Sequence, residues 1–290
     1  MTGPVLILCA TRLEMAAFLA RHRTGPMDGA PGNLDLLSGL PKSWYLVISG
    51  PGVFNAARAL TVCLERFRPA FIVHTGIAGV FDGTGLGVGD AAVAVTDTYI
   101  HTGVDTGCPG SDEPGEMGPG GTRHNQGGND SGGTRSHPGS PAPRSGQKPL
   151  TGATRPSMLL EPLPFDLIPG QPDTRRGVYR LDTGLAGSCH RRLTRSLNCR
   201  VGKGPFVTVS AITGSFEKAA ALSDAFSPVM ESMEGAAAAH VAALYQVPMV
   251  QVRAGANRVG ERDKQQWDIE TAVHTVADIC DIMLERGICS

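Results

Sequence analysis

The sequence contains no apolar run that approaches the roughly 20 residues of a membrane-spanning helix. Its first ten residues, MTGPVLILCA, also lack the basic segment that precedes the apolar part of a secretion signal. These absences predict a soluble, cytoplasmic protein that does not bind a membrane. A surplus of positive charge is missing as well, because 26 Lys and Arg face 27 Asp and Glu, for a net charge of −1. We therefore do not expect nucleic acid as a partner.

Metal-binding and disulfide patterns are absent too. The seven cysteines are an odd number with no C-x-x-C pair, and the eight histidines form no pair with ligand spacing. A disulfide framework and a structural zinc site are therefore poor hypotheses. We expect a protein that uses no metal and no other cofactor.

Hydrophobic residues make up 41% of the chain, which is enough for a core, but one segment has almost none. Residues 106–157 hold 13 Gly and 8 Pro among 52 residues, and residues 106–149 include no Val, Ile, Leu, Phe, Tyr or Trp. Burial cannot offset the ordering entropy of such a segment, so we predict a disordered Gly/Pro/Ser-rich insertion. Taking 52 from 290 leaves 238 residues, which suits a single domain over 1–290 that this loop interrupts.

Short β-rich segments alternate with helical ones in the rest of the chain. The predicted strands are mostly apolar on both faces, as in a parallel sheet that is covered by helices on both sides. They are Val5–Cys9, Tyr45–Ser49, Ala70–His74, Ala91–Val95, Phe206–Ala211 and Met249–Arg253. The predicted helices are Phe54–Phe67, Glu234–Tyr245 and Ile269–Glu285. The alternation predicts an α/β protein, a three-layer α/β/α fold with a central, largely parallel mixed sheet.

In such folds ligands bind at the carboxyl ends of the strands, so the residues after each strand are candidates for a site. Glu14 follows the first predicted strand, where a carboxylate can activate water; the alternative is a carboxylate that stabilises a helix N-terminus. Glycine turns follow the next two strands, at Ser49–Gly52 and Thr75–Gly79. They let a ligand approach the backbone, although tight turns also need glycine for conformational reasons alone.

The densest group of polar residues is Glu231–Gly235, together with Arg253 and Asn257 at the end of the last predicted strand. A carboxylate, a guanidinium and an amide supply charge, orientation and hydrogen-bond specificity. Structural alternatives exist: Glu234 as a helix N-terminal residue, and Arg253 as the partner of a structural carboxylate, since buried charges must be paired.

Together these motifs resemble the nucleoside phosphorylase superfamily with its purine nucleosidases, and most closely the futalosine hydrolases. The specific part is Ser232-Met233-Glu234-Gly235 with Arg253, Asn257 and Val259-Gly260, while the glycine turns only support it. The resemblance covers most of the chain outside the insertion. It also runs through Leu6–Glu14, Asn55–Ala57, Val88–Asp90, Val209–Ser215 and Glu231–His240.

The resemblance implies a role for each candidate residue. In the related methylthioadenosine/adenosylhomocysteine nucleosidases, a glutamate after the first strand is the base for the attacking water, and Glu14 matches it. Glu234 would accept hydrogen bonds from the ribose 2′- and 3′-hydroxyls, and Arg253 would help to hold the water and the carboxylates. The implied substrate-binding residues are Ile77, Ala78, Gly79, Thr213, Ser215, Ser232, Met233 and Arg253. Two carboxylates suit the positive charge of an oxocarbenium-like transition state.

The chain departs from the adenine-cleaving relatives at Asn257, where they use an aspartate to protonate N7. An amide cannot be that acid, but its NH2 donates and its carbonyl accepts. A 6-oxopurine offers a matching set, with O6 and N7 as acceptors and N1–H as a donor. Asn257 is therefore the third predicted catalytic residue. It favours a hypoxanthine leaving group, as in the hydrolysis of futalosine in the alternative menaquinone pathway.

Three alternatives stay open: a purine nucleoside phosphorylase, a methylthioadenosine/adenosylhomocysteine nucleosidase, and a non-catalytic nucleoside-binding domain. Phosphate-using relatives carry a G-D-P-x-R type loop after the first strand, whereas this one ends in Cys9–Glu14, and a carboxylate would repel phosphate. Arg12 is a candidate anion contact. The resemblance also implies a homodimer or a higher homo-oligomer that binds a small nucleoside and water.

The loop at 209–215 differs from that of the adenine nucleosidases, which place a base-stacking phenylalanine there where this chain has Gly214. Phe206 and Phe216 are nearby candidates for stacking, with core packing as the alternative. Trp267 is predicted to anchor a loop.

Deletion of residues 106–149 is expected to leave the fold intact, because a segment without large apolar side chains adds nothing to a core. The circular dichroism spectrum and the melting temperature of the deletion variant should match those of the full chain. An insoluble or unfolded variant would contradict the predicted insertion.

Overall fold

The computed structural model of the chain describes residues 4–26, 35–40, 44–106 and 160–286. Its helices are α1 (Ala16–Arg21), α2 (Val53–Arg66), α3 (Thr183–Ser196), α4 (Phe216–Phe226), α5 (Gly235–Leu244) and α6 (Ile269–Arg286), with 3-10 turns at η3 (Pro172–Arg176) and η4 (Lys264–Gln266). Its strands are β1 (Val5–Cys9), β2 (Gly25–Pro26), β3 (Asp35–Ser38), β4 (Trp44–Ile48), β5 (Phe71–His74), β6 (Ile77–Val80), β7 (Ala91–Tyr99), β8 (Val178–Arg180), β9 (Val201–Thr208), β10 (Met230–Ser232) and β11 (Met249–Arg258). Apart from its first residue, the predicted insertion lies outside the described residues.

The described strands form one mixed sheet in the order β2-β3-β4-β1-β5-β11-β6-β10-β9-β7-β8. The stretch β4-β1-β5-β11-β6 is parallel throughout. Strand β11 is long, so its first residues pair with β5 while its later residues pair with β6. It also pairs antiparallel with β7, which closes β11, β6, β10, β9 and β7 into a ring. The sheet thus joins an open parallel half to a closed half, and β11 belongs to both.

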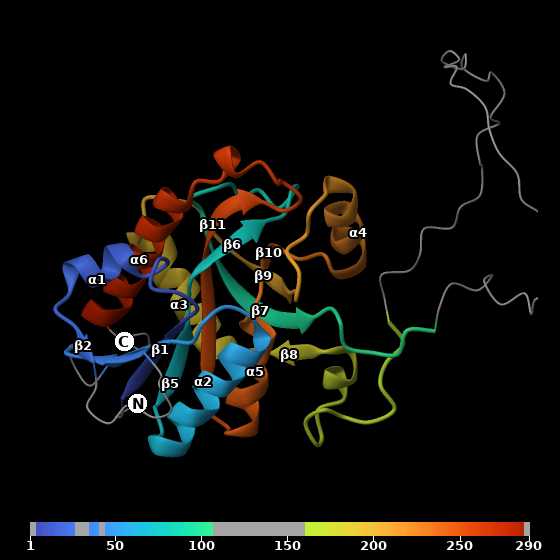
Figure 1. Cartoon of the computed structure of the whole chain (residues 1–290), viewed down its shortest axis with the longest axis horizontal. Coiled ribbons are helices and arrows are strands. Elements are labelled where there is room, and N and C mark those ends of the chain that lie inside the picture. The colour runs from blue at the N-terminus through green and yellow to red at the C-terminus, as the bar shows by residue number, and fades with distance from the viewer. Residues whose placement is uncertain (1–3, 27–34, 41–43, 107–159, 287–290) are drawn as a thin grey trace, which may run out of the picture. The chain divides into compact units, whose positions relative to one another are not determined.

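Helices cover the sheet on two sides and make the three layers (Figure 1). On one side, apolar residues of α1, α3 and α6 pack against alternate residues of the central strands, such as Ile7, Val73 and Val252. On the other side, α2 and α5 pack against the opposite set, such as Leu6 and Ile72. Because successive side chains of a strand point to opposite faces, strands that are apolar at every position serve both cores. The predicted α/β/α fold is confirmed.

The predicted elements occur where expected, and several more are present. Strand β1 has the predicted bounds, while β7 and β11 extend beyond their predicted ends. The predicted strand Phe206–Ala211 is wrong at both ends, because β9 begins at Val201 and ends at Thr208. The start of β9 escaped prediction because it reads Val-Gly-Lys-Gly-Pro, a composition that disfavours strands. Strands β6 and β10 escaped because they have only four and three residues and contain turn-like glycine or polar residues. Helices α3 and α4 were missed as well.

Among the described residues, no helix is both long enough and apolar enough to cross a lipid bilayer.

Candidate active site

A pocket of about 260 Å³ collects most of the predicted site residues. It is lined by segments that follow β1 and β4 and by residues of β6, β10 and β11, together with the residues between β10 and α5. The lining residues are Ala10, Thr11, Leu13, Glu14, Pro51, Ile77, Ala78, Gly79, Ile212, Glu231, Ser232, Met233, Glu234, Asn257 and Trp267. Segments that are far apart in the chain thus meet where neighbouring strands end, as expected for a sheet of this kind.

Glu14 is held from two directions and does not cap a helix. Its Oε2 accepts hydrogen bonds from the backbone N of Thr11 at 2.8 Å and from the Thr11 hydroxyl at 2.9 Å. Its Oε1 accepts from the backbone N of Ile77 at 3.1 Å. The thiol of Cys9 lies 3.6 Å from Oε2. Glu14 is only 6% exposed. Donors from the loop after β1 and from β6 hold its carboxylate at the pocket wall.

Glu234 occupies the N-cap position of α5, yet its side chain makes no capping bond. Instead, its Oε1 accepts a hydrogen bond from the backbone N of Gly52 at 2.9 Å, and its Oε2 lies 3.6 Å from Nη2 of Arg253. The glycine turn after β4 therefore binds the carboxylate through its backbone. The structural alternative of a helix-capping Glu234 does not describe this residue.

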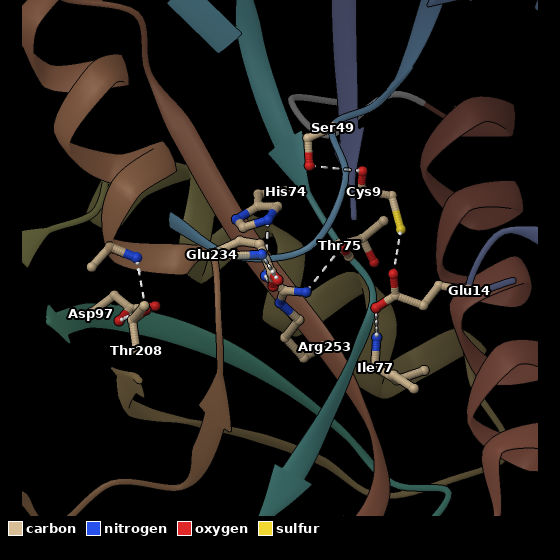
Figure 2. A network of polar contacts seen from close by, with 12 residues as sticks. Cys9, Glu14, Ser49, His74, Thr75, Ile77, Asp97, Thr208, Glu234 and Arg253 are labelled. Carbon is tan, nitrogen blue, oxygen red and sulfur yellow. Dashed lines mark hydrogen bonds and ion pairs between the residues drawn. The ribbon is translucent and has the colours of Figure 1, made fainter. Parts of the chain in front are cut away.

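Arg253 is fully buried and is not among the residues that line the pocket. Figure 2 shows it beside His74, Thr75 and Glu234. Its Nη2 donates to Nε2 of His74 at 2.8 Å, and its Nη1 donates to the carbonyl oxygen of Thr75 at 3.3 Å. Burial, and then the nearby guanidinium, lower the pKa of His74 well below its usual value, so this imidazole is a neutral acceptor. Among the described residues, Glu234 is the carboxylate that the structure pairs with Arg253.

A glycine, Gly76, lies between Arg253 and Glu14. Gly76 has a φ of +143°, and a Cβ at this position would come within 2.7 Å of both Nη1 of Arg253 and Oε1 of Glu14. The arginine and the first predicted catalytic carboxylate therefore approach each other across a backbone that carries no side chain. Only glycine combines this conformation with this close approach.

A buried carboxyl group lies on the far side of Arg253. Asp97 on β7 is fully buried, and its Oδ1 accepts a hydrogen bond from the Thr208 hydroxyl at 2.7 Å (Figure 2). The same hydroxyl oxygen accepts from the backbone N of Ala236 at 2.8 Å, so it ties Asp97 to the first turn of α5. Burial raises the pKa of Asp97 to about 6, although the Thr208 bond and Arg253 oppose the shift.

Asn257 also lines the pocket and is 8% exposed. Its Nδ2 donates to the carbonyl oxygen of Arg258 at 2.9 Å. The register of β11 against β6 shifts between Gly255 and Asn257, and this irregularity places Asn257 opposite Gly79. A β-bulge re-aims a side chain in this way.

Three predicted substrate-binding residues are not among the residues that line the pocket: Thr213, Ser215 and Arg253. Thr213 is buried and binds Glu231 through its backbone N and its hydroxyl. Ser215 is the exposed N-cap of α4, where its hydroxyl accepts from the backbone N of Lys218 at 3.2 Å. The fully buried Arg253 contacts the lining residue Glu234, as Thr213 contacts Glu231, and the predicted roles of all three in substrate binding stay predictions.

The structure also gives the positions of the candidates for base stacking, loop anchoring and anion contact. Phe206 is fully buried in the core, and Phe216 lies half-exposed with the Arg258 guanidinium 5.7 Å from its ring centre, so neither lines the pocket. Trp267 donates from Nε1 to the carbonyl oxygen of Glu261 at 3.2 Å and also lines the pocket. Arg12, the candidate anion contact, instead pairs with Asp35 at 2.5 Å on the surface.

Several residues that shape the site were not predicted. Thr11 provides two of the three N–H and O–H donors to Glu14, and His74, Asp97 and Thr208 form the layer behind Arg253. A polar residue inside an otherwise apolar strand is the signal that could have found His74 and Asp97. The described residues contain no group of three His, Cys, Asp or Glu side chains that could hold a metal ion.

The comparisons with known proteins agree with this geometry. The model of the phosphorylase superfamily matches residues 4–285, and the chain belongs to that superfamily. A 5′-methylthioadenosine/S-adenosylhomocysteine nucleosidase of Bacillus cereus strain AH187 is 24% identical over 244 residues, which cover 83% of this chain and 80% of that protein. The enzyme of the same name from Oceanobacillus iheyensis is 45% identical, but over only 22% of this chain and 27% of its own length.

Solved structures share the fold at low sequence identity. The 5′-methylthioadenosine/S-adenosylhomocysteine nucleosidase of Neisseria meningitidis aligns with a TM-score of 0.68 at 18% identity and covers 98% of this chain and 99% of its own. The futalosine hydrolase of Helicobacter pylori aligns with a TM-score of 0.66 at 17% identity and covers 98% of each chain. The fold is therefore that of the nucleoside phosphorylases.

The Asp97→Asn variant tests the buried carboxyl group through the pH dependence of stability. Because the pKa of Asp97 is raised from 3.8 to about 6 on folding, its contribution is fully present below the lower value and is lost as pH rises through the higher one. The loss amounts to about 3 kcal/mol. The variant should therefore gain several degrees of melting temperature over the wild type between about pH 4 and pH 7.

The surface variant Asp173→Asn is the matched control, since Asp173 pairs with Arg180 in solvent. An exposed pair contributes little, so its melting temperature should follow that of the wild type at each pH. A pH-independent difference between Asp97→Asn and the wild type would contradict the raised pKa.

Proposed function

We infer that this protein hydrolyses the N-glycosidic bond of a purine nucleoside whose base is a 6-oxopurine, as in futalosine. The observation that carries this inference is the meeting of Glu14, Glu234 and Asn257 in one pocket, although they come from three distant parts of the chain. A nucleosidase needs a base for water, a partner for the ribose and a donor for the departing base, and these three residues provide them. The named relatives are nucleosidases, which supports the reaction class.

Glu14 serves as the base that activates water. Its carboxylate is aligned by the Thr11 and Ile77 donors, and the remaining lone pair of Oε1 accepts a proton from water that attacks the anomeric carbon. As the bond to the base breaks, positive charge develops on the sugar. Two carboxylates held at the pocket wall stabilise that charge without having to reorganise.

Glu234 binds the ribose hydroxyls through its carboxylate oxygens, and Met233 packs against the sugar ring. Gly52 and Arg253 each hold one of the Glu234 oxygens, so the carboxylate keeps one orientation. Arg253 does not need to touch the substrate for this role. Its positive charge offsets the negative charge of Glu234 in a buried position.

Asn257 selects the base. Its NH2 group donates to N7 or O6 of a hypoxanthine leaving group and so stabilises the negative charge that develops there. Proton delivery to N7, where it is needed, comes from water. Adenine departs less readily, because the amide donates a hydrogen bond but has no acidic proton to transfer to N7.

Hydrolysis is favoured over phosphorolysis by the charge of the pocket. The described lining includes three glutamates, Glu14, Glu231 and Glu234, and no Lys, Arg or His. Arg12 is engaged by Asp35 outside the pocket. An inorganic phosphate dianion would enter a field of its own sign, whereas neutral water does not.

A methylthioadenosine/adenosylhomocysteine nucleosidase is the second candidate, and the lining of the pocket favours it. Leu13, Ile212 and Met233 offer an apolar surface to a thioether substituent. A carboxybenzoyl group such as that of futalosine finds no cation among the described lining residues. Asn257 is the residue that weighs against this second candidate, because the adenine-cleaving relatives use an aspartate there.

The experiment that decides between them measures kcat/KM for a matched pair of substrates, futalosine and its 6-amino relative, which releases adenine instead of hypoxanthine. Futalosine should be cleaved at least about tenfold better, because one mismatched polar contact costs about 1–3 kcal/mol. Equal or better cleavage of the 6-amino compound would refute the 6-oxopurine assignment. The Asn257→Asp variant should move the preference toward the 6-amino compound. A rate that depends on phosphate would instead indicate phosphorolysis.

Glu14→Gln tests the role of the base. Loss of a general base typically lowers the rate about 10² to 10⁴-fold, whereas binding of the free purine should change little. The assay compares kcat/KM with the dissociation constant of hypoxanthine. The exposed Glu217→Gln on α4 is the matched control and should keep full activity. Unchanged turnover with weakened binding would make Glu14 a binding group.

A further inference from the structure

The helix α5 is capped by a residue from another strand. Glu234 is the N-cap residue of α5, yet its side chain makes no capping hydrogen bond. The backbone N of Ala236, in the first turn of α5, donates instead to the hydroxyl oxygen of Thr208 at 2.8 Å. Thr208 ends β9, so an acceptor from a distant part of the chain replaces the one that an N-cap side chain normally supplies.

Asp97 fixes the direction of this hydroxyl. A threonine hydroxyl has one proton and two lone pairs, and Oδ1 of Asp97 accepts the proton of Thr208 at 2.7 Å. The lone pairs of Thr208 are therefore left for the N–H of Ala236, and Figure 2 shows Thr208 next to Asp97. Asp97 and Thr208 are both fully buried, so bulk water does not compete for either bond.

The first residue of α5 also packs directly on Asp97. A Cβ at Gly235 would overlap Oδ2 of Asp97 and Nε2 of Gln251. The missing side chain thus lets the start of α5 approach β7 and β11 closely. Asp97 therefore holds the first turn of α5 in two ways, through this contact and through the hydroxyl of Thr208.

The cap from β9 leaves the carboxylate of Glu234 available for other partners. Its Oε1 accepts from the backbone N of Gly52 at 2.9 Å, and its Oε2 lies 3.6 Å from Nη2 of Arg253. Glu234 lines the pocket, whereas Thr208 does not. If Glu234 had to cap Ala236, its side chain would turn back over the first turn of the helix and leave these partners.

We propose that Thr208, oriented by Asp97, is a positioning residue that caps α5 in place of Glu234 and so keeps the Glu234 carboxylate directed at the ribose hydroxyls. This rests on the proposed function, which assigns the ribose to Glu234, and deepens it. Without the Thr208 hydroxyl, the N–H of Ala236 is buried without an acceptor, which is costly. Glu234 then has two competing uses, as a helix cap and as a ribose ligand, and its alignment on the sugar is lost.

The test is Thr208→Val, which removes the hydroxyl at nearly constant volume, assayed with futalosine and its 2′-deoxy derivative. The ratio of kcat/KM for futalosine to that for the 2′-deoxy compound should fall by more than about tenfold relative to the wild type, because a misaligned carboxylate no longer recognises the 2′-hydroxyl. The different intrinsic stability of the two glycosidic bonds cancels in this comparison. Thr208→Ser keeps the hydroxyl and should restore the wild-type ratio. An unchanged ratio in Thr208→Val, or an equal fall for both compounds, would make the cap a purely structural feature and overturn the proposal.

Asp182→Ala is the matched control. Asp182 is the exposed N-cap of α3, and its Oδ1 accepts from the backbone N of Leu185 at 2.7 Å. Loss of this cap should lower the melting temperature but leave the substrate ratio at the wild-type value. A ratio that falls in this variant as well would overturn the specific role of Thr208. Thr208→Cys, whose thiol is a weak acceptor, provides the same test with a smaller fall if Thr208→Val does not fold.

Failure of the proposed function looks different. The wild type then cleaves the 6-amino relative of futalosine better than futalosine itself, and the ribose comparison is made with that compound and its 2′-deoxy form. A lower ratio in Thr208→Val would support the positioning role there too, and an unchanged ratio would overturn it.

Discussion

The ion pair between Arg253 and Glu234 is the interaction on which the candidate site depends. Arg253 is fully buried, and a buried guanidinium needs partners for its charge and its N–H groups, although its Nε has none among the described residues. Glu234, His74 and the Thr75 carbonyl are those partners, and they come from α5's N-terminus and from the end of β5. The pair therefore ties β11 to two other elements at the very place where the pocket opens.

The ring of strands explains why such a pair can form. Strand β11 leaves the open parallel sheet at its midpoint and continues into the ring with β6 and β7, and Arg253 lies where it changes partners. At this junction the backbone of Gly76 passes between Arg253 and Glu14, and its missing side chain lets the two groups approach. The catalytic geometry thus follows from a topological feature, and a glycine makes that feature compatible with two charged side chains.

Much of the site could be predicted from the sequence because parallel strands bring their carboxyl ends together. Glu14, Glu234 and Asn257 each follow or end a recognisable apolar strand or start a helix, and the pocket contains all three. The support layer could not be predicted in this way. His74 ends β5 and Asp97 lies within β7, and although a polar residue in a buried strand is a signal, the sequence does not show whether it serves the site or the core. The bonds of Thr213 to Glu231 could not be predicted either, because side-chain direction in a loop depends on tertiary contacts; its role in substrate binding stays a prediction.

Some strands of the fold could be predicted from the sequence and others could not. Strands with continuous apolar residues, such as β1 and β5, were evident from composition, since burial on both faces demands it. The predicted homo-oligomer stays a prediction, as does the disorder of the insertion. Strands β6 and β10, by contrast, are too short and too rich in glycine or polar residues to show a period, yet they supply Gly79 and Glu231. Residues that line the pocket replace the apolar residues that would have marked these strands.

The charges of the pocket connect these features to the proposed chemistry. Three carboxylates line the cavity, and Arg253, which pairs with one of them, is not among the lining residues, so the described lining is acidic. An acidic cavity attracts positive charge and repels anions. Of the states along nucleoside cleavage, the one with a cationic sugar gains most from that field, whereas an incoming phosphate loses. A pocket that was merely suited to holding a neutral nucleoside would not need to bury three acids, because each costs stability in the empty protein. The cost is explained if the acids act when charge develops on the sugar.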